Sequence, residues 1–138
     1  MLYSSPLKLF GGIKTKLRDD GEFINIKACI KPIVNLARIY ALKYHITTPG
    51  TIARLEALHQ QKHINDATFD NIISAFAYLW RLRFYNQLIA HADLRNINDD
   101  LSLNDLNDSE KNNLKKVLKG INTLQSRLSF EFLGTDIN

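Results

Sequence analysis

The pattern of hydrophobic and polar positions changes near residue 30 of the chain. Before that point, LKLFGGIKTKL and EFINIKA are short runs with partial alternation of apolar and polar residues, and RDDGE lies between them. Asp-Gly between two such runs is a typical signal for a β-hairpin. Because an isolated hairpin is only marginally stable in water, the pattern predicts a hairpin arm over residues 7–28 that packs against another element.

From Pro32 onward, apolar residues recur at the three- and four-residue steps of an α-helix. Pro32 suits the first turn of a helix, where its missing N–H costs nothing. Residues 47–50, Thr-Thr-Pro-Gly, end this first helix, and Thr51 is expected to cap a short second helix, TIARLEALHQQ. The apolar stripe of the first helix consists of Ile30, Ile33, Val34, Ala37, Ala41 and Tyr44.

Two longer helices are predicted in the second half of the chain. Asn65 or Asp66 is expected to cap a third helix that continues to about His91, and the Asn- and Asp-rich segment after it is predicted to begin as a loop. Asn107 and Glu110 resemble a capping box at the start of a fourth helix. Its stripe consists of Leu114, Val117, Leu118, Ile121, Leu124 and Leu128. Long helices with short links predict a mainly α fold, an antiparallel four-helix-type bundle over residues 30–132, within a single domain 1–138.

The third helix carries polar side chains where burial is expected. At 100° per residue, Arg83 and Gln87 continue its main apolar face and are neighbours, being four residues apart. Arg81 lies in the same apolar stretch, AYLWRLRFYNQLIAH. The main face consists of Phe69, Ile72, Ile73, Phe76, Leu79 and Trp80, and a second stripe consists of Tyr78, Leu82, Tyr85 and Ile89. A helix that is apolar on two sides is either central or covers a partner.

These polar residues allow two interpretations. A guanidinium is a planar fork of donors that suits phosphate or carboxylate, and a neighbouring amide can orient it, so Arg83 with Gln87 is a candidate anion or nucleotide site. On the first helix, Lys31, Asn35 and Arg38 share one edge, and they would join the same basic groove if the two helices are neighbours. Alternatively, Arg83 reaches water at the end of the bundle, Gln87 bonds the backbone, and the other cations form a solvated face.

Composition and charge add modest constraints. The chain has 138 residues with a net charge of +4 and a sequence pI of about 9.2, which is compatible with an anionic partner. No apolar run approaches the roughly 20 residues of a membrane span, and no signal segment opens the chain. The single cysteine, Cys29, cannot form an internal disulfide and is expected to be buried, which favours a cytoplasmic protein.

Signals for catalysis or metal binding are weak. His59 and His63 are four residues apart, but no HExxH motif, Gly-rich phosphate loop or nucleophile elbow occurs. The adjacent acidic pairs, residues 19–20 and 99–100, are expected to lie in turns with their side chains diverging. The sequence therefore predicts neither a catalytic centre nor a metal site.

Four segments of the chain carry a family resemblance. KPIVNLARIYALKYHI, TIARLEAL, AFAYLWRLRFYNQ and LKKVLKGINTLQSRL occur in this order, with the Asn/Asp-rich loop before the last. Together they resemble the putative nucleotidyltransferase substrate-binding domain, from about Leu7 to Phe132. That domain follows a nucleotidyltransferase domain in bacterial signalling proteins, relatives of protein-PII uridylyltransferase, which often carry cyclic-nucleotide-binding and CBS modules. Asn35 departs from the family, which tends to have Asp there.

The resemblance implies a helical bundle like the C-terminal domain of kanamycin nucleotidyltransferase and a non-catalytic, accessory role. In such proteins the preceding domain performs the chemistry with a Gly-Ser turn and paired carboxylates, and this sequence has neither. Mg²⁺ and a nucleoside triphosphate would serve that catalytic domain, and no cofactor is expected here. The expected partners are the upstream nucleotidyltransferase domain of the same protein, an acceptor that is a protein or a small molecule, and a second copy of the chain as a further option; no membrane or nucleic acid is expected. The residues predicted to face the acceptor cleft are Arg38, Arg83, Gln87, Lys31, Asn35 and Arg81.

Two other functions fit the same bundle. One is an interaction or dimerisation module without a small ligand. The other is a helical ribonuclease of the kind found in toxin systems, which needs an Arg and a His separated by four to six residues. Seven residues separate Arg83 from His91, so the second alternative fits the spacing poorly.

Overall fold

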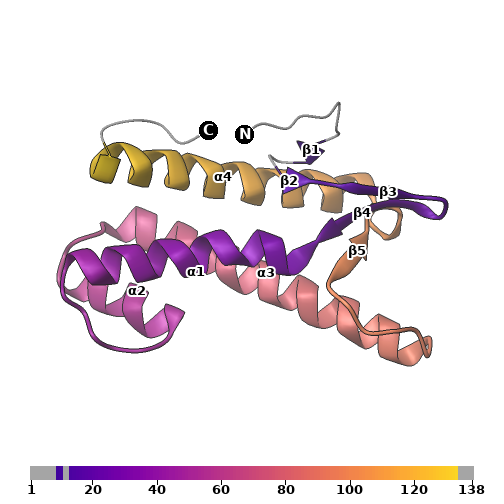
Figure 1. Ribbon diagram of the computed structural model, residues 1–138, viewed down its shortest axis with the longest axis horizontal. Coiled ribbons are helices and arrows are strands. Elements are labelled where there is room, and N and C mark those ends of the chain that lie inside the picture. The colour runs from indigo at the N-terminus through magenta and orange to yellow at the C-terminus, as the bar shows by residue number, and fades with distance from the viewer. Residues whose placement is uncertain (1–8, 11–12, 134–138) are drawn as a thin grey trace.

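Four helices and a small set of antiparallel strands make up the computed structural model, which describes residues 9–10 and 13–133 (Figure 1). The helices are α1 (Ile26–Lys43), α2 (Thr51–Gln60), α3 (Asp66–Ala92) and α4 (Asp108–Leu133). The strands are β1 (Leu9–Phe10), β2 (Ile13–Lys14), β3 (Lys16–Arg18), β4 (Gly21–Asn25) and β5 (Asp100–Ser102), and a 3-10 turn, η1 (Leu103–Asp105), follows β5. The predicted mainly α fold with an N-terminal hairpin is confirmed.

The hairpin of β3 and β4 packs against a third strand. Arg18 pairs with Gly21 across the turn, and a Cβ at Gly21, where φ is +129°, would collide with the side chain of Asn104. On its other edge β4 pairs with β5, so that Ile24 lies opposite Leu101. The predicted loop follows α3 over residues 93–99, but strand β5 after it was not predicted, because three residues are too few to show a period. Residues 7–8 and 11–12 of the predicted arm lie outside the described part of the chain.

The first helix starts earlier than predicted. The Asn25 side chain caps it by accepting a hydrogen bond from the Ala28 N–H at 2.9 Å, so α1 begins at Ile26 and the predicted arm boundary at residue 28 is wrong. The prediction that Thr51 caps the second helix is also wrong, because Gly50, with φ of +94°, occupies the N-cap position without a side-chain bond. The predicted caps of the two later helices are confirmed: Asn65 caps α3, and Asn107 with Glu110 forms the capping box of α4.

Helix α1 is the centre of the bundle. It packs against α2, α3 and α4, whereas α3 and α4 contact one another little. Eight of its residues are buried: Ile26, Cys29, Ile30, Ile33, Leu36, Ala37, Tyr40 and Ala41. Helix α3 is longer but buries Ile72, Leu79 and Ala90, since its C-terminal half extends beyond the other helices (Figure 1).

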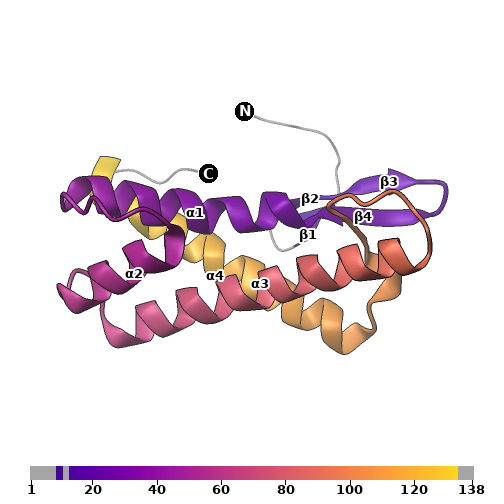
Figure 2. The same cartoon turned by 90° about the horizontal axis from the view of Figure 1, so that it is seen from below.

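The direction of α4 determines how the bundle opens. Seen from below, α4 passes obliquely behind α1 and α3 and does not run parallel to α3 (Figure 2). Its C-terminal part is held to α1 by a hydrogen bond of 2.7 Å from the Tyr40 hydroxyl to the Glu131 carboxylate. None of the helices in the described residues is both long enough and apolar enough to cross a bilayer.

Asp100, the first residue of β5, accepts hydrogen bonds from basic and polar side chains of the hairpin. Its carboxylate accepts hydrogen bonds from the Arg18 guanidinium, from Lys16 Nζ at 3.5 Å and from Asn25 Nδ2 at 3.4 Å. Burial acts to raise the pKa of Asp100, but the hydrogen bond from Arg18 and the charges of Lys16 and Arg18 outweigh it and lower the pKa below its ordinary value.

The Asp100 cluster makes stability depend on acid pH. A carboxylate whose pKa is lower in the folded state stabilises the fold above the unfolded pKa, about 3.9, and loses that contribution as pH falls through the folded pKa. We expect the free energy of unfolding, measured in urea from pH 2 to pH 7, to decrease below about pH 4, and Asp100→Asn to flatten that decrease. Asp20→Asn, in the exposed β3–β4 turn, is the control. An unchanged pH profile in Asp100→Asn would contradict this role.

Candidate functional site

The guanidinium of Arg83 is bonded inside the domain. Its Nε and Nη2 donate to the two carboxylate oxygens of Asp99 at 2.7 and 3.2 Å, and both side chains are about four-fifths buried, with exposed fractions of 20% and 19%. The guanidinium also lies 4.9 Å from the centre of the Trp80 ring. The Asp99 carbonyl oxygen accepts from the Ile26 N–H at 2.8 Å. Arg83 therefore connects α3 to the loop before β5 and to the start of α1.

The structure does not bring the predicted site residues into one groove. Helices α1 and α3 are antiparallel (Figure 1), and Arg83 lies beside the first residue of α1. Arg38 follows that residue by twelve positions, which is about 18 Å along the helix. Of the other predicted residues, Lys31 and Arg81 are exposed, and Asn35 and Gln87 are half-buried. Their roles in binding stay predictions.

A groove lies between α3 and α4 in the described part of the chain. It has a volume of about 670 Å³ and exists because α4 packs on α1 and diverges from α3. The wall from α3 contains Thr68, Asn71, Ser74, Ala75 and Tyr78, and the wall from α4 contains Asn113, Lys116, Val117, Gly120, Ile121, Thr123, Leu124 and Arg127. Apolar side chains with a few hydroxyl, amide and cationic groups are typical of small-molecule sites of this size.

The groove is electropositive. Lys116 and Arg127 line it, and none of the lining residues is acidic. Both cations are exposed and have no ion pair within the described residues. Eleven positions separate them, so they lie about 16 Å apart along α4. The Tyr78 phenol stays protonated, since burial and the Glu110 charge raise its pKa against the opposing effect of Arg81.

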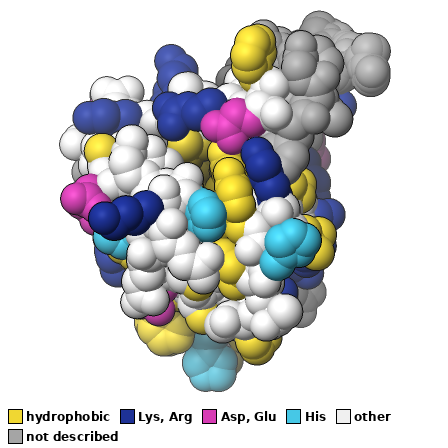
Figure 3. Space-filling model, turned by 90° about the vertical axis from the view of Figure 1, so that its left-hand side faces the viewer, with side chains coloured by type: hydrophobic (Ala, Val, Ile, Leu, Met, Phe, Trp, Pro, Cys, Tyr) yellow, Lys and Arg dark blue, Asp and Glu magenta, His cyan; other side chains and the backbone are white. Residues whose placement is uncertain are grey.

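A smaller polar chamber of about 160 Å³ adjoins the Arg127 end of the groove. The two cavities share Thr68, Leu124 and Arg127. The chamber contains the Tyr40–Glu131 hydrogen bond, and burial followed by this bond raises the pKa of the Tyr40 phenol. Figure 3 faces this end of the bundle and shows hydrophobic side chains at the bottom of a hollow with basic, acidic and histidine side chains around it.

The sequence contained two signals for this groove. The predicted second stripe of α3 faces concave surface along its length: Tyr78 lines the groove, and Leu82, Tyr85 and Ile89 line a neighbouring cavity of about 460 Å³. The second signal is Gly120, because a glycine inside a helix costs about 1 kcal/mol relative to alanine. Nothing lies within 4 Å of a Cβ built at Gly120, so close packing does not explain the residue.

His59 and His63 both have structural partners. His59 Nε2 lies 2.6 Å from Asp66 Oδ1 and its ring stacks on Phe69, whereas the His63 ring stacks on Tyr44 with 3.7 Å between ring centres. No group of three or more His, Cys, Asp or Glu side chains in the described residues could hold a metal ion. Cys29 is buried as predicted, and burial raises the pKa of its thiol to about 12.

The Arg83–Asp99 pair should stabilise the fold. Removing one partner of a buried pair leaves the other charge without compensation, so Arg83→Ala is expected to reduce the free energy of unfolding by about 3 kcal/mol. Arg83→Lys should recover only part of this loss, because an ammonium cannot form the two-point bond. Arg81→Ala, an exposed arginine two residues away, is the control and should change stability by less than about 0.5 kcal/mol in urea unfolding. Equal stability of Arg83→Ala and Arg81→Ala would contradict this interpretation.

Comparison with known proteins gives a family for the chain. A family model described as "Putative nucleotidyltransferase substrate binding domain" matches residues 1–132. No curated protein and no solved structure matches the chain. The match covers nearly the whole sequence and agrees with the mainly helical fold. The chain therefore belongs to the family of putative nucleotidyltransferase substrate-binding domains.

Proposed function

We propose that this domain binds the acceptor substrate of a nucleotidyl transfer reaction in the α3–α4 groove and performs no chemistry itself. The groove is the observation that carries the proposal: it is large and open, its charged lining residues are both basic, and apolar and polar side chains share its walls. Family membership supplies the reaction class. This location differs from the predicted one around Arg83, whose Nε and Nη2 already donate to the two carboxylate oxygens of Asp99.

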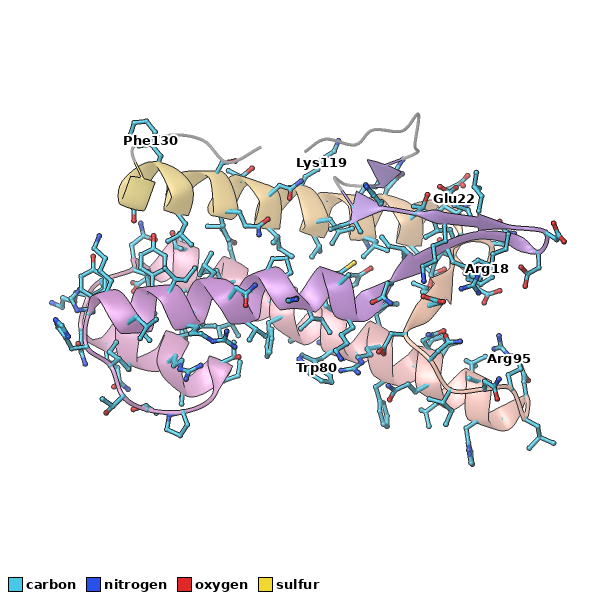
Figure 4. All side chains as sticks on the ribbon, in the orientation of Figure 1. Arg18, Glu22, Trp80, Arg95, Lys119 and Phe130 are labelled. Carbon is cyan, nitrogen blue, oxygen red and sulfur yellow. The ribbon has the colours of Figure 1, made fainter. Side chains whose placement is uncertain are left out.

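A second surface on α3 suits the packing of a catalytic domain. Trp80, Phe84 and Leu88 recur at four-residue steps, and their side chains are 43%, 61% and 50% exposed. Figure 4 shows Trp80 directed away from the bundle. Large exposed side chains at helical spacing are typical of interaction sites. We propose that a nucleotidyltransferase domain of the same protein packs on this face, which lies on a different side of α3 from the groove-lining residues Ala75 and Tyr78.

In this proposal, Mg²⁺ and the nucleoside triphosphate bind to the catalytic domain. The donor set of the groove agrees, since hydroxyls, amides and cations line it and Mg²⁺ prefers carboxylate and phosphate oxygens. A cytoplasmic, bacterial signalling protein is the proposed setting. It follows from the family resemblance and from the single, buried cysteine.

Substitutions of Gly120 test the groove. A metabolite panel is screened by thermal unfolding of the purified chain, since a ligand present at 100 times its Kd stabilises by about 2.7 kcal/mol, or roughly 8 °C for a domain of this size. We expect ligands that stabilise the wild type to lose their effect in Gly120→Phe, which places a bulky side chain in the middle of the groove. Gly120→Ala should itself be more stable by up to about 1 kcal/mol, and should still bind.

Lys119→Gln is the matched surface control, because Figure 4 shows Lys119 on the side of α4 away from α3. Ligands that stabilise wild type and Gly120→Phe equally would place binding outside the groove. A folded Gly120→Phe variant, shown by circular dichroism, is required for either conclusion.

The exposed face of α3 also favours one alternative, a dimerisation module without a small ligand. Under our proposal the isolated chain is expected to sediment as a monomer of 15.8 kDa, because its partner for that face is another domain. A stable dimer that Phe84→Ser converts to a monomer, while Tyr85→Ser at similar exposure does not, would instead favour the alternative.

A further inference from the structure

The geometry points to an elongated organic anion as the acceptor: an apolar body lying along the groove, with a carboxylate or phosphate head at Arg127. This inference rests on the proposed function and adds the chemical class of the ligand. It combines three properties of the groove, namely its length, the chemistry of its middle section and the charge at its end.

The middle of the groove suits an apolar body. Ala75 on α3 and Val117, Ile121 and Leu124 on α4 face this section, and Gly120 leaves space beside them. Asn71, Ser74 and Thr123 line the same section and can bond polar groups of a ligand. The apolar body is therefore assigned to the α4 side of the groove, where polar groups would find no partner at Val117, Ile121 and Leu124. A small ion such as inorganic phosphate would fill little of the 670 Å³, so the volume also favours a larger molecule.

The charged end of the groove suits an anionic head. Arg127 is exposed and has no ion pair in the described residues, and the Thr68 hydroxyl lines the same end. A guanidinium can donate two parallel hydrogen bonds to a carboxylate or a phosphate, which an ammonium such as that of Lys116 cannot do. The head is therefore assigned to Arg127 and the far end of the body to the Lys116 side.

Two nearby carboxylates oppose this assignment and have to be weighed. The charge of Glu110 acts on Tyr78, but Glu110 is seventeen positions from Arg127, about 25 Å along α4. Glu131 lines the adjoining chamber, and its charge would repel an anion. Its Oε2, however, accepts the hydrogen bond from the Tyr40 hydroxyl, and no ion pair joins it to Arg127 among the described residues. The groove itself keeps two cations and no acidic lining residue, so its charge complements an anion.

Isothermal titration calorimetry of the whole chain with four probes tests the inference. The probes are decanoate, decyl phosphate, decanol and inorganic phosphate. We expect both anionic amphiphiles to bind at least tenfold more tightly than decanol, and inorganic phosphate to bind more weakly than any of them. The comparison between decanoate and decyl phosphate shows which head is preferred.

Three variants locate the binding. Arg127→Gln should reduce the affinity for the anionic amphiphiles about tenfold, to the level of decanol, while Gly120→Phe should abolish binding of all three decyl probes. Lys119→Gln should leave every affinity unchanged. Equal affinities for decanol and decanoate, an effect of Lys116→Gln in place of Arg127→Gln, or full binding by Gly120→Phe would overturn the inference. If the metabolite panel yields another class of ligand that Gly120→Phe excludes, the proposed function stands and this inference fails.

Discussion

The burial of α1 among the other three helices is the constraint on which the rest of the structure depends. Eight residues of this helix are buried on more than one side, so α3 and α4 both pack on α1 and contact one another little. Interiors are close-packed. Because the apolar face of α4 packs on α1, α4 does not also pack closely against α3. The groove between α3 and α4 is therefore a consequence of the core and not a surface irregularity.

Arg83, one of the polar residues inside the apolar third helix, has a structural explanation. Arg83 lies where α3 leaves the core, and the chain returns past it through Asp99, whose carbonyl oxygen also bonds the first amide of α1. The pair therefore holds three segments that are distant in sequence at one place. The carboxylate of the adjacent residue, Asp100, bonds the hairpin instead. The side chains of Asp99 and Asp100 therefore point in different directions, as predicted, and connect different elements.

Much of the fold was predictable from the sequence, because helical periodicity and capping chemistry are local. The capping box at Asn107 and the cap at Asn65 follow from side chains three residues from their partners. Strand β5 and the ion pair of Arg83 with Asp99 were not predictable in this way. Both depend on where the chain returns after α3, and periodicity carries no information about that path.

The candidate site was predictable only in part, for a related reason. Arg83 is conspicuous in sequence since it interrupts an apolar face, but the pattern does not show that a carboxylate sixteen residues later neutralises it. Arg127 is inconspicuous in sequence, being one of many cations on a solvated helix, and becomes significant only through the oblique path of α4 (Figure 2). Gly120 is a local sequence signal for the groove, because glycine is unfavourable inside a helix. Only the structure shows that the space beside Gly120 is open.

Together the fold and the family membership support our proposal of a domain that holds an acceptor in a groove and acts with a catalytic domain. The central claim is that recognition occurs between α3 and α4. Nuclear magnetic resonance of the ¹⁵N-labelled chain during titration with decanoate tests this claim most directly, because each backbone amide reports its own surroundings. The account predicts that the largest shift changes occur at Thr68, Ser74, Gly120 and Thr123. Changes centred instead on the exposed face around Phe84, or spread evenly over the surface, would contradict it.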